Sequence, residues 1–251
     1  MRLLYNKGDR PAQNDIEEGD DVYNLPDSKR YTKTHAGDIV QIDSSPLTGY
    51  KNLLINGDKR VNYRDFDGSS FVDGEYCWDR WKATATAMVQ IVEEGNYIPD
   101  TEYTLSGDGV TTQQLTSPAS GHWTIPEVPR TATEIQLELG DTATNFEQRS
   151  IALERSLCQR YYWTGKVNGK GQGVKYMEGS ENYAFAGSLT FPTEMRTTPT
   201  ITTIEEPIFE NCTFADFSYT RHGFIIRAKT TESTKYRIRE GKYAADAEIY
   251  P

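Results

Sequence analysis

One helix-like stretch interrupts a sequence that otherwise reads as strands and turns, and this stretch constrains the fold most. Residues 134–163 read EIQLELGDTATNFEQRSIALERSLCQRYYW. Residues 135–139 alternate apolar and polar side chains with the period of a half-buried strand, and a glycine-aspartate turn signal follows. Ser150 is a suitable N-cap for a helix. The side chains predicted to pack inward from this helix recur at four-residue spacing: Leu153, Leu157 and Tyr161.

The rest of the chain has the composition of a β protein. Its 251 residues are only 36% hydrophobic, and tyrosine (16) outnumbers phenylalanine (9) and tryptophan (4). Short apolar or alternating runs recur at about ten-residue spacing with Gly or Pro between them, which favours a sandwich or jelly roll. Strands are predicted at 51–57, 60–63, 75–81, 83–93, 102–105, 113–115, 122–125, 134–139, 183–191, 198–204, 209–219, 223–229 and 235–239.

The expected fold class is therefore mainly β, with two antiparallel β-sandwich (jelly-roll-like) domains joined by one short helix. The first sandwich is predicted over residues 51–149, the linking helix over 150–163 and the second β domain over 164–251. Residues 1–50 are polar and rich in Gly, Asp and Pro, with one short strand candidate at 38–43. Such a segment buries little surface by itself. We expect an extended N-terminal arm that packs either on its own globular part or on a partner chain.

The charge of the chain excludes several classes of partner. The net charge is −10, whereas nucleic acids and anionic membranes call for a basic surface. No run of 18 apolar residues exists, so no membrane insertion is expected. The three cysteines are far apart in the sequence, which fits synthesis in a reducing cytosol.

No arrangement of residues indicates catalysis, and we predict that the protein is not an enzyme. His35, His122 and His222 lie in separate segments, so no metal site, cofactor or catalytic triad is indicated. Residues 165–173 (GKVNGKGQG) lack the ending of a phosphate-binding loop and are predicted to form a flexible turn. Adjacent acidic pairs would point to opposite faces of a strand, which is unsuited to the facing carboxylates of a glycosidase.

Exposed aromatic side chains on a β scaffold are the remaining chemistry. Tyr and Trp stack on the apolar faces of sugars, while neighbouring polar groups bind the hydroxyls. Each such aromatic is alternatively a core or subunit contact. The glycan-binding candidates are Trp163, Tyr176, Tyr183, Tyr219 and His222.

Several phrases of the sequence together resemble bacteriophage tail-fibre proteins. The residues QLELGDTATNFEQRS (136–150) and LCQRYYW (157–163) are similar to a junction in which a carbohydrate-binding-module-like sandwich is followed by a helix. NLLINGDKRVNYRD (52–65) and WDRWKA (78–83) resemble phrases of that sandwich. FPTEMRTTPTIT (191–202) and KYAADAEI (242–249) resemble phrases of the C-terminal fibre domain. The resemblance covers about residues 51–251, and asparagine stands at position 145 where the family often has proline.

The resemblance implies a non-enzymatic receptor-binding protein of the virion tail, made in the bacterial host cytoplasm. It implies a homotrimer that attaches to other virion tail proteins through the N-terminal arm and binds host cell-surface polysaccharide through its C-terminal β domains. One alternative is a structural virion protein, such as a head fibre or tail adaptor, without receptor binding. A second, less favoured alternative is a polysaccharide depolymerase.

Overall fold

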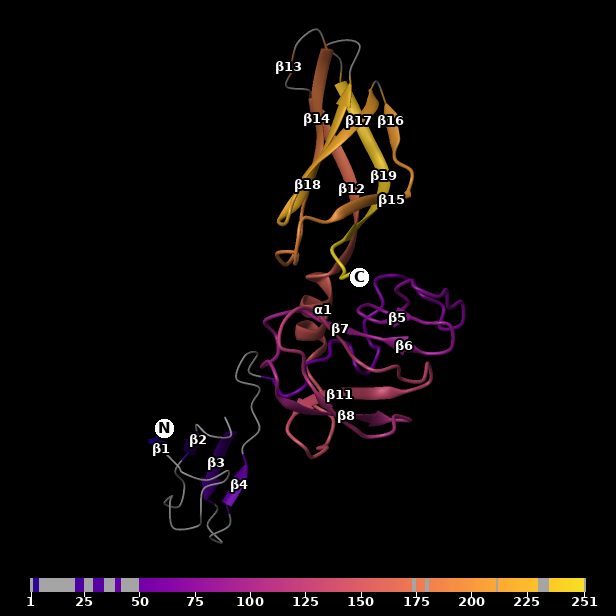
Figure 1. Cartoon of the computed structure of the whole chain (residues 1–251). Helices are drawn as coiled ribbons and strands as arrows, with labels where there is room; N and C mark the ends of the chain where they lie inside the picture. The colour runs from indigo at the N-terminus through magenta and orange to yellow at the C-terminus, as the bar shows by residue number, and fades with distance from the viewer. Residues whose placement is uncertain are drawn as a thin grey trace. The chain divides into compact units, whose positions relative to one another are not determined.

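The computed structural model describes residues 2–4, 21–24, 29–33, 39–41, 50–172, 175–178, 181–210, 212–229 and 235–250 (Figure 1). Side chains are described for 50–166, 188–210, 212–229 and 241–250. The described backbone is mainly β with one α-helix, so the predicted β class is confirmed. No helix in this part of the chain is long and apolar enough to span a membrane.

By their internal contacts, the residues form two compact units that each draw on separate stretches of sequence. Unit 1 comprises Met1–Leu54, Val92–Trp123 and Glu134–Glu147, and unit 2 comprises Ile55–Ile91, Thr124–Thr133 and Gln148–Pro251. Residues 55–91 therefore pack with the helix and the C-terminal strands. This division does not follow the boundaries expected from the sequence at 50, 149 and 163.

Four short strands are described among residues 1–50. They are β1 (Arg2–Leu4), β2 (Asp21–Asn24), β3 (Lys29–Lys33) and β4 (Ile39–Gln41), in the order β1-β2-β3-β4. The β1–β2 pair is parallel and the other pairs are antiparallel. The predicted strand at 38–43 contains β4. The described part of the segment is thus a small sheet rather than an extended arm.

A three-stranded sheet, β11-β8-β9, is built from β8 (Glu102–Asp108), β9 (Gln113–Thr116) and β11 (Thr133–Leu139). The expectation of a half-buried strand at 135–139 is wrong, because Gln136 and Glu138 are buried as well as the apolar residues between them. The chain after β11 folds back over these polar side chains. The Thr144 backbone N–H donates to Glu138 Oε1 at 2.8 Å, and the Glu147 N–H donates to Gln136 Oε1 at 2.8 Å. Buried polar groups are stable when paired in this way.

Residues 51–93 contain only short strands, and the sandwich predicted over 51–149 is not formed by the described residues. The strands in this region are β5 (Lys82–Ala83), β6 (Met88–Val89) and β7 (Ile91–Val92). β5 pairs with β6, and β7 pairs with β10 (Trp123–Thr124) from later in the chain. The strands predicted at 51–57, 60–63 and 75–81 are absent. Positive φ angles at Asn56 (59°) and Lys59 (57°) turn the backbone away from an extended path.

The only helix in the described residues is α1 (Ile151–Gln159). Ser150 is its N-cap, as predicted, and the Ser150 Oγ accepts a hydrogen bond from the Leu153 N–H at 3.4 Å. Strand β12 (Tyr162–Gln172) begins three residues after the helix ends. The prediction of a flexible turn at 165–173 is wrong, because residues 165–172 belong to this strand and pair with β19 across a register shift between Val167 and Gly169.

The C-terminal part of unit 2 contains two four-stranded sheets. Their other strands are β13 (Lys175–Glu178), β14 (Glu181–Thr190), β15 (Thr200–Glu205), β16 (Ile208–Glu210), β17 (Thr213–Thr220), β18 (Gly223–Lys229) and β19 (Lys235–Asp246). One sheet has the order β12-β19-β15, with β16 also paired to β19, and the other has the order β13-β14-β18-β17. The strands predicted at 183–191, 198–204, 223–229 and 235–239 are present, whereas the single strand predicted at 209–219 is two strands, β16 and β17, in different sheets.

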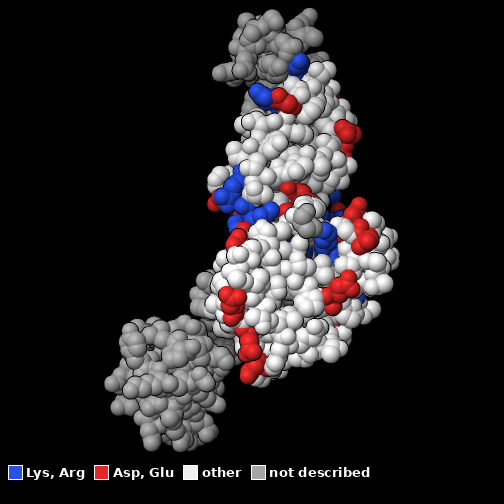
Figure 2. Space-filling view, viewed as in Figure 1, with Lys and Arg blue, Asp and Glu red and all other residues white. Residues whose placement is uncertain are grey.

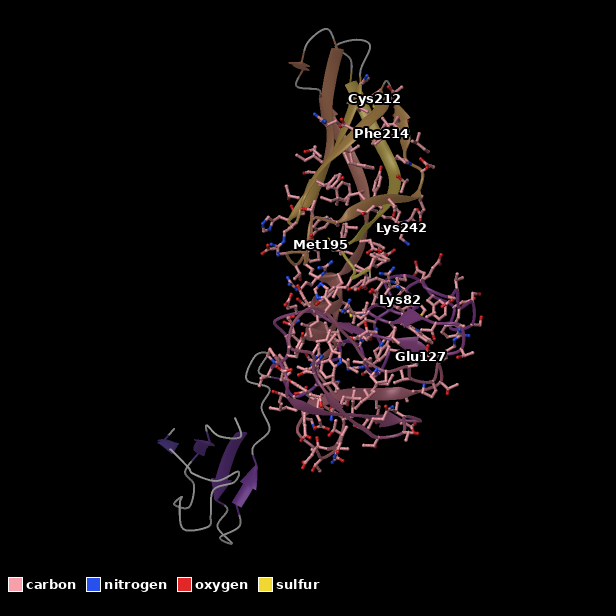
Figure 3. The ribbon with its side chains drawn as sticks, viewed as in Figure 1. Lys82, Glu127, Met195, Cys212, Phe214 and Lys242 are labelled. Atoms are coloured by element: carbon pink, nitrogen blue, oxygen red, sulfur yellow. The ribbon has the colours of Figure 1, made fainter. Side chains whose placement is uncertain are left out.

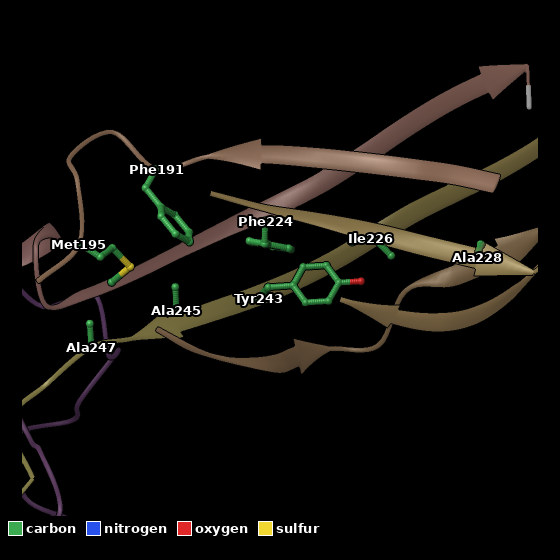
Figure 4. Close-up of a cluster of buried hydrophobic side chains, with 8 residues drawn as sticks. All are labelled: Phe191, Met195, Phe224, Ile226, Ala228, Tyr243, Ala245 and Ala247. Atoms are coloured by element: carbon green, nitrogen blue, oxygen red, sulfur yellow. The ribbon is translucent and has the colours of Figure 1, made fainter. Parts of the chain in front are cut away.

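One hydrophobic cluster, which we call the sandwich cluster, lies between these two sheets. Alternate residues of β18 (Phe224, Ile226 and Ala228) face Tyr243 and Ala245 of β19 and Ala247 just after it, joined by Phe191 and Met195 from the chain after β14 (Figure 4). Small alanines on β19 stand opposite aromatic rings, which allows close packing of the two sheets. This apolar alternation is what made the C-terminal strands predictable.

Candidate functional site

The predicted glycan-binding residues do not form one surface in the described structure. Trp163 is half-buried and packs on the sandwich cluster, with its ring 5.4 Å from that of Phe191 in a T-shaped contact. Tyr219 is 45% exposed and His222 is exposed. Tyr176 on β13 and Tyr183 on β14 form a cross-strand pair, but their side chains lie outside the described residues. Tyr219 and His222 are therefore the members that the structure places at the surface.

The hairpin between β17 and β18 holds these two residues in a fixed position. Tyr219 pairs with Phe224, whose buried ring anchors the strand in the core. The turn at Arg221 and His222 is bound to the chain after β14. The Phe191 N–H donates to the His222 carbonyl at 2.8 Å, and the Met195 N–H donates to the Arg221 carbonyl at 2.9 Å.

The hairpin surface offers donors and acceptors suited to sugar hydroxyls. Arg221 Nη2 lies 3.0 Å from Glu194 Oε1 in an exposed ion pair beside His222. The turn thus offers an imidazole and a guanidinium, with the Glu194 carboxylate from the chain after β14 beside Arg221 and an aromatic ring at the end of β17. On the face seen in Figure 2, charged side chains occur in small groups on a largely uncharged surface.

The described residues hold no metal-binding cluster, and two of their thiols are buried. No group of three or more His, Cys, Asp or Glu side chains there is placed to hold a metal ion. Cys77 and Cys158 are buried, and burial raises the pKa of both thiols. A raised pKa disfavours the reactive thiolate, so neither thiol is suited to nucleophilic chemistry.

The predicted inward face of the helix is partly wrong. Tyr161 is buried, but Leu153 and Leu157 are only half-buried, and the fully buried residues of α1 are Glu154 and Cys158. The buried face of α1 thus lies one residue later than predicted, at Glu154 and Cys158 instead of Leu153 and Leu157, and it includes a charged side chain. The reason is that α1 has polar partners in the loop segments: Glu154 accepts from the Asn56 N–H, and Gln159 Nε2 donates to the Tyr63 hydroxyl at 2.8 Å.

Asn56 is the centre of these polar contacts. Its N–H donates to Glu154 Oε1, and its Nδ2 donates to the carbonyls of Val61 (2.8 Å) and Asp79 (3.1 Å). Its carbonyl accepts from Trp81 Nε1 at 2.8 Å. Asn56 is completely buried. The side chain and backbone of Asn56 therefore connect α1 with the loop segments around Val61 and around Asp79 and Trp81.

Arg80 joins the same loop to the C-terminal tail. Its side chain is 1% exposed, and its guanidinium forms an ion pair with Glu248, whose side chain is also buried. The guanidinium also lies 3.6 Å from the Tyr161 ring centroid and donates from Nη2 to the Ile91 carbonyl at 2.6 Å. Burial acts to lower the pKa of Arg80, but Glu248 and the neighbouring tyrosines outweigh it and raise the pKa. Arg80 therefore remains charged inside the protein.

Arg64 repeats this arrangement beside Arg80. Its guanidinium lies 3.7 Å from the Tyr162 ring centroid, and Nη2 lies 3.3 Å from Glu248 Oε1. The tail is bound further by Tyr76, whose hydroxyl donates to the Ile249 carbonyl at 2.7 Å. We call this network the charged joint and define it by one set of residues: Asn56, Arg64, Tyr76, Asp79, Arg80, Glu154, Tyr161, Tyr162 and Glu248.

Asp79 is the least satisfied member of the charged joint. Its Oδ2 accepts from the Tyr63 N–H at 2.5 Å, while its buried Oδ1 has no hydrogen-bond partner among the described residues. Burial raises the pKa of Asp79 to about 6, against the opposing effects of the Tyr63 N–H and Arg64. The sequence offered one indirect signal for the charged joint, since charged residues lie close to aromatic and apolar ones in residues 76–81 (YCWDRW) and 243–250 (YAADAEIY).

Comparison of the chain with family models, with curated proteins and with solved structures finds no match.

Proposed function

We propose that this chain is a component of a bacteriophage tail fibre. In this proposal residues 1–50 attach it to other virion tail proteins, and its C-terminal β domain binds host-surface glycan without catalysis. The protein would be located in the virion tail and would act as a homotrimer. Multiple copies suit this role, because several weak sites together exceed the affinity of one site by roughly a hundredfold or more.

The supporting observation is that the tail-fibre-like phrases contact one another. Asn56 comes from the phrase at 52–65, Arg80 from the phrase at 78–83 and Glu248 from the phrase at 242–249. These residues meet in the charged joint, although Arg80 and Glu248 are 168 positions apart. Phrases that resembled a family by chance would have no reason to supply each other's buried partners. A joint of this kind would fix how the C-terminal sheets are presented.

The β17–β18 hairpin is the surface that we assign to glycan binding. The full-length chain should bind to host cells and to an array of bacterial surface polysaccharides. The double substitution Tyr219→Ala with His222→Ala should reduce binding at least tenfold. Thr213→Ala, at an exposed position on the same strand, is the matched control and should bind like the original chain. Equal binding by the double variant would refute this assignment, and release of reducing sugar from the polysaccharide would refute the non-catalytic role.

A structural virion protein is the second candidate, and one surface feature favours it. Ile204 and Ile208 are 46% and 51% exposed on neighbouring strands, and Phe214 is 44% exposed. Exposed apolar side chains of this size suit burial against another protein. Imaging of the intact particle would separate the two roles, because a receptor-binding chain leaves the β17–β18 hairpin free at the outside of the virion.

A further inference from the structure

The loop after β14, residues 191–196, connects the β17–β18 turn with the end of α1. The Met195 N–H donates to the Arg221 carbonyl at 2.9 Å, and the next N–H along the chain, that of Arg196, donates to the Arg160 carbonyl at 2.8 Å. Met195 is buried in the sandwich cluster, and Figure 3 shows it at the end of the two sheets that adjoins α1. The loop is therefore anchored, and it places Arg196 next to the turn that carries Arg221.

Arg196 carries a positive charge that no carboxylate balances directly. Its Nε donates to the Ala247 carbonyl at 2.8 Å, and its Nη2 donates to the Glu248 carbonyl at 3.0 Å. Both acceptors are backbone oxygens, which hold the guanidinium in place without neutralising it. The carboxylate of Glu248 is paired instead with Arg64 and Arg80. Among the described residues no acidic side chain forms an ion pair with Arg196, which is only half-buried.

Arg221 is held in a similar way and has one weak acidic partner. Its Nε donates to the Met195 carbonyl at 2.9 Å, so a backbone oxygen also fixes this guanidinium. Glu194 Oε1 lies 3.0 Å from Arg221 Nη2, and both side chains are more than 40% exposed. An ion pair at this exposure contributes little, because water competes for both charges. An anionic ligand is therefore able to take the place of Glu194.

The local charge is opposite to that of the whole chain. Residues 191–199 and 217–223 contain two arginines and one acidic residue, whereas the chain has 37 acidic and 27 basic residues. An acidic polymer would be repelled by most of such a chain and attracted at this place. Charge thus favours one location for an acidic ligand.

The groups at this location are suited to an anion on a sugar. A guanidinium binds a carboxylate or a phosphate through two parallel hydrogen bonds. Because Arg196 and Arg221 are already held by carbonyls, less side-chain entropy is lost when they bind. His222 adds an exposed imidazole that bonds to no described residue, and Tyr219 adds a ring that is 45% exposed. A charged group and a sugar ring therefore both have partners here.

We propose that the β17–β18 hairpin and the loop 191–196 together bind an acidic glycan. Arg221 and Arg196 would bind its carboxylate or phosphate groups, and Tyr219 and His222 would contact its sugar rings. Glu194 would leave Arg221 when the ligand binds. This inference rests on the proposed glycan binding by the hairpin, and it narrows the ligand to an acidic polysaccharide.

The first test compares three polymers on the full-length chain by surface plasmon resonance. Polygalacturonate carries a carboxylate on each sugar, its fully methyl-esterified form carries none, and poly(glycerol phosphate) carries phosphodiesters. At least one acidic polymer should bind about tenfold more tightly than the ester, and added salt should weaken that binding by screening. The preference between the two acidic polymers identifies the anion.

The outcomes separate this inference from the proposed function. Equal binding of polygalacturonate and its ester, or no binding of either acidic polymer, would overturn the acidic ligand. If neutral polysaccharides bind instead and Tyr219→Ala with His222→Ala abolishes their binding, the glycan-binding hairpin stands and only its acidic preference is refuted. Absence of binding to host cells and to every polysaccharide would refute both.

Charge-removing variants test the two arginines. Arg221→Gln and Arg196→Gln should each weaken binding of the preferred acidic polymer about tenfold, the loss typical of one hydrogen bond to a charged group. Arg227→Gln is the matched control, because it removes the same charge from β18 while Arg227 is paired with Asp216. It should bind like the original chain. Circular dichroism and thermal unfolding would establish that the variants are folded, and an equal loss with Arg227→Gln would overturn the assignment.

Glu194→Gln gives the sharpest test, because the sign of its effect depends on the ligand. For an acidic polymer the substitution frees Arg221 and should strengthen binding by about two- to fivefold, the effect of one exposed ion pair. For a neutral glycan it would remove an acceptor for sugar hydroxyls and weaken binding. Weaker binding of both acidic polymers by Glu194→Gln would contradict the proposal.

Discussion

The charged joint and the sandwich cluster solve the same packing problem with opposite chemistry. In the sandwich, Phe224, Ile226 and Tyr243 are buried among apolar neighbours. In the joint, Asn56, Arg80 and Glu248 are equally buried but are held by hydrogen bonds, an ion pair and ring contacts. Apolar contacts tolerate imperfect neighbours, whereas a buried charge needs one particular partner. The joint should therefore specify one arrangement of its segments and should fail when a single partner is removed.

The largest expected effect is the loss of Arg80. Arg80→Ala leaves Glu248 buried with Arg64, 3.3 Å away, as its remaining cationic partner, which should cost about 3 kcal/mol of unfolding free energy, the low end of the range for a broken buried pair. Arg227→Ala is the matched control. Arg227 forms a two-pronged ion pair with Asp216 at 2.5 and 2.6 Å, but both side chains are about 40% exposed or more. An exposed pair of this kind contributes about 0–1 kcal/mol.

Urea unfolding of both variants would measure this contrast directly. Arg80→Met combined with Glu248→Leu should recover part of the loss, because apolar groups of similar volume replace the ion pair while Arg64 keeps Asp246, 3.7 Å away, as its acidic partner. Similar losses for Arg80→Ala and Arg227→Ala would show that burial gives the joint no special sensitivity.

Asp79 should make the stability of the joint depend on pH. Its pKa is about 6 in the folded protein and 3.8 ordinarily. The folded state thus binds the proton of Asp79 more tightly than the unfolded state does. The contribution of this protonation to the unfolding free energy is therefore fully present below pH 3.8 and is lost as the pH rises through 6. The full difference corresponds to about 3 kcal/mol, of which roughly 2 kcal/mol is lost between pH 4 and pH 7. The groups that act on Asp79 are Arg64, Glu248, Cys158 and the Tyr63 N–H.

Asp79→Asn should remove this component of the pH dependence. The unfolding free energies of variant and original chain, measured from pH 4 to pH 7.5, should diverge toward neutral pH in favour of the variant. Asp73→Asn replaces an exposed carboxylate in the same segment and should leave the pH profile unchanged. Parallel curves for Asp79→Asn and the original chain would contradict the raised pKa.

The difference between the two regions also explains what the sequence could predict. Strands β14, β15, β17, β18 and β19 follow apolar alternation, and α1 follows from its spacing and its N-cap, so local pattern was sufficient. The joint depends on pairs such as Asn56 with Glu154 and Arg80 with Glu248, which are 98 and 168 positions apart. Periodicity assigns such polar residues to solvent, which is why the helix face was expected at Leu153 and Leu157. Trp163 was expected at the surface for a related reason, since aromatic residue type does not distinguish a core ring from a binding surface.

Gly165 tests the packing of the sandwich rather than its charge. A Cβ atom at this position would lie 2.0 Å from the Trp163 ring, which therefore must leave its contact with Phe191. Gly165→Ala should cost about 1–3 kcal/mol, the usual range for overpacking. In a Trp163→Ala background the same change should cost much less, and the coupling would be measured by a double-mutant cycle in urea. Additive effects would show that the ring does not pack over Gly165.

The smallest expected effect compares one hydroxyl in each region. The Tyr243 hydroxyl is buried in the sandwich with no hydrogen-bond partner among the described residues, whereas the Tyr76 hydroxyl donates to the Ile249 carbonyl in the joint. Tyr243→Phe removes an unsatisfied polar group and should leave the unfolding free energy unchanged or raise it by about 1 kcal/mol. Tyr76→Phe removes a used hydrogen bond and should lower it by about 1 kcal/mol. Thermal unfolding resolves changes of this size. If the unfolding free energy rises on Tyr243→Phe and falls on Tyr76→Phe, the same substitution has opposite effects in the two regions. The sign then distinguishes the polar joint from the apolar sandwich better than the size of either change. A loss on Tyr243→Phe equal to that on Tyr76→Phe would mean that the sandwich also depends on polar partners.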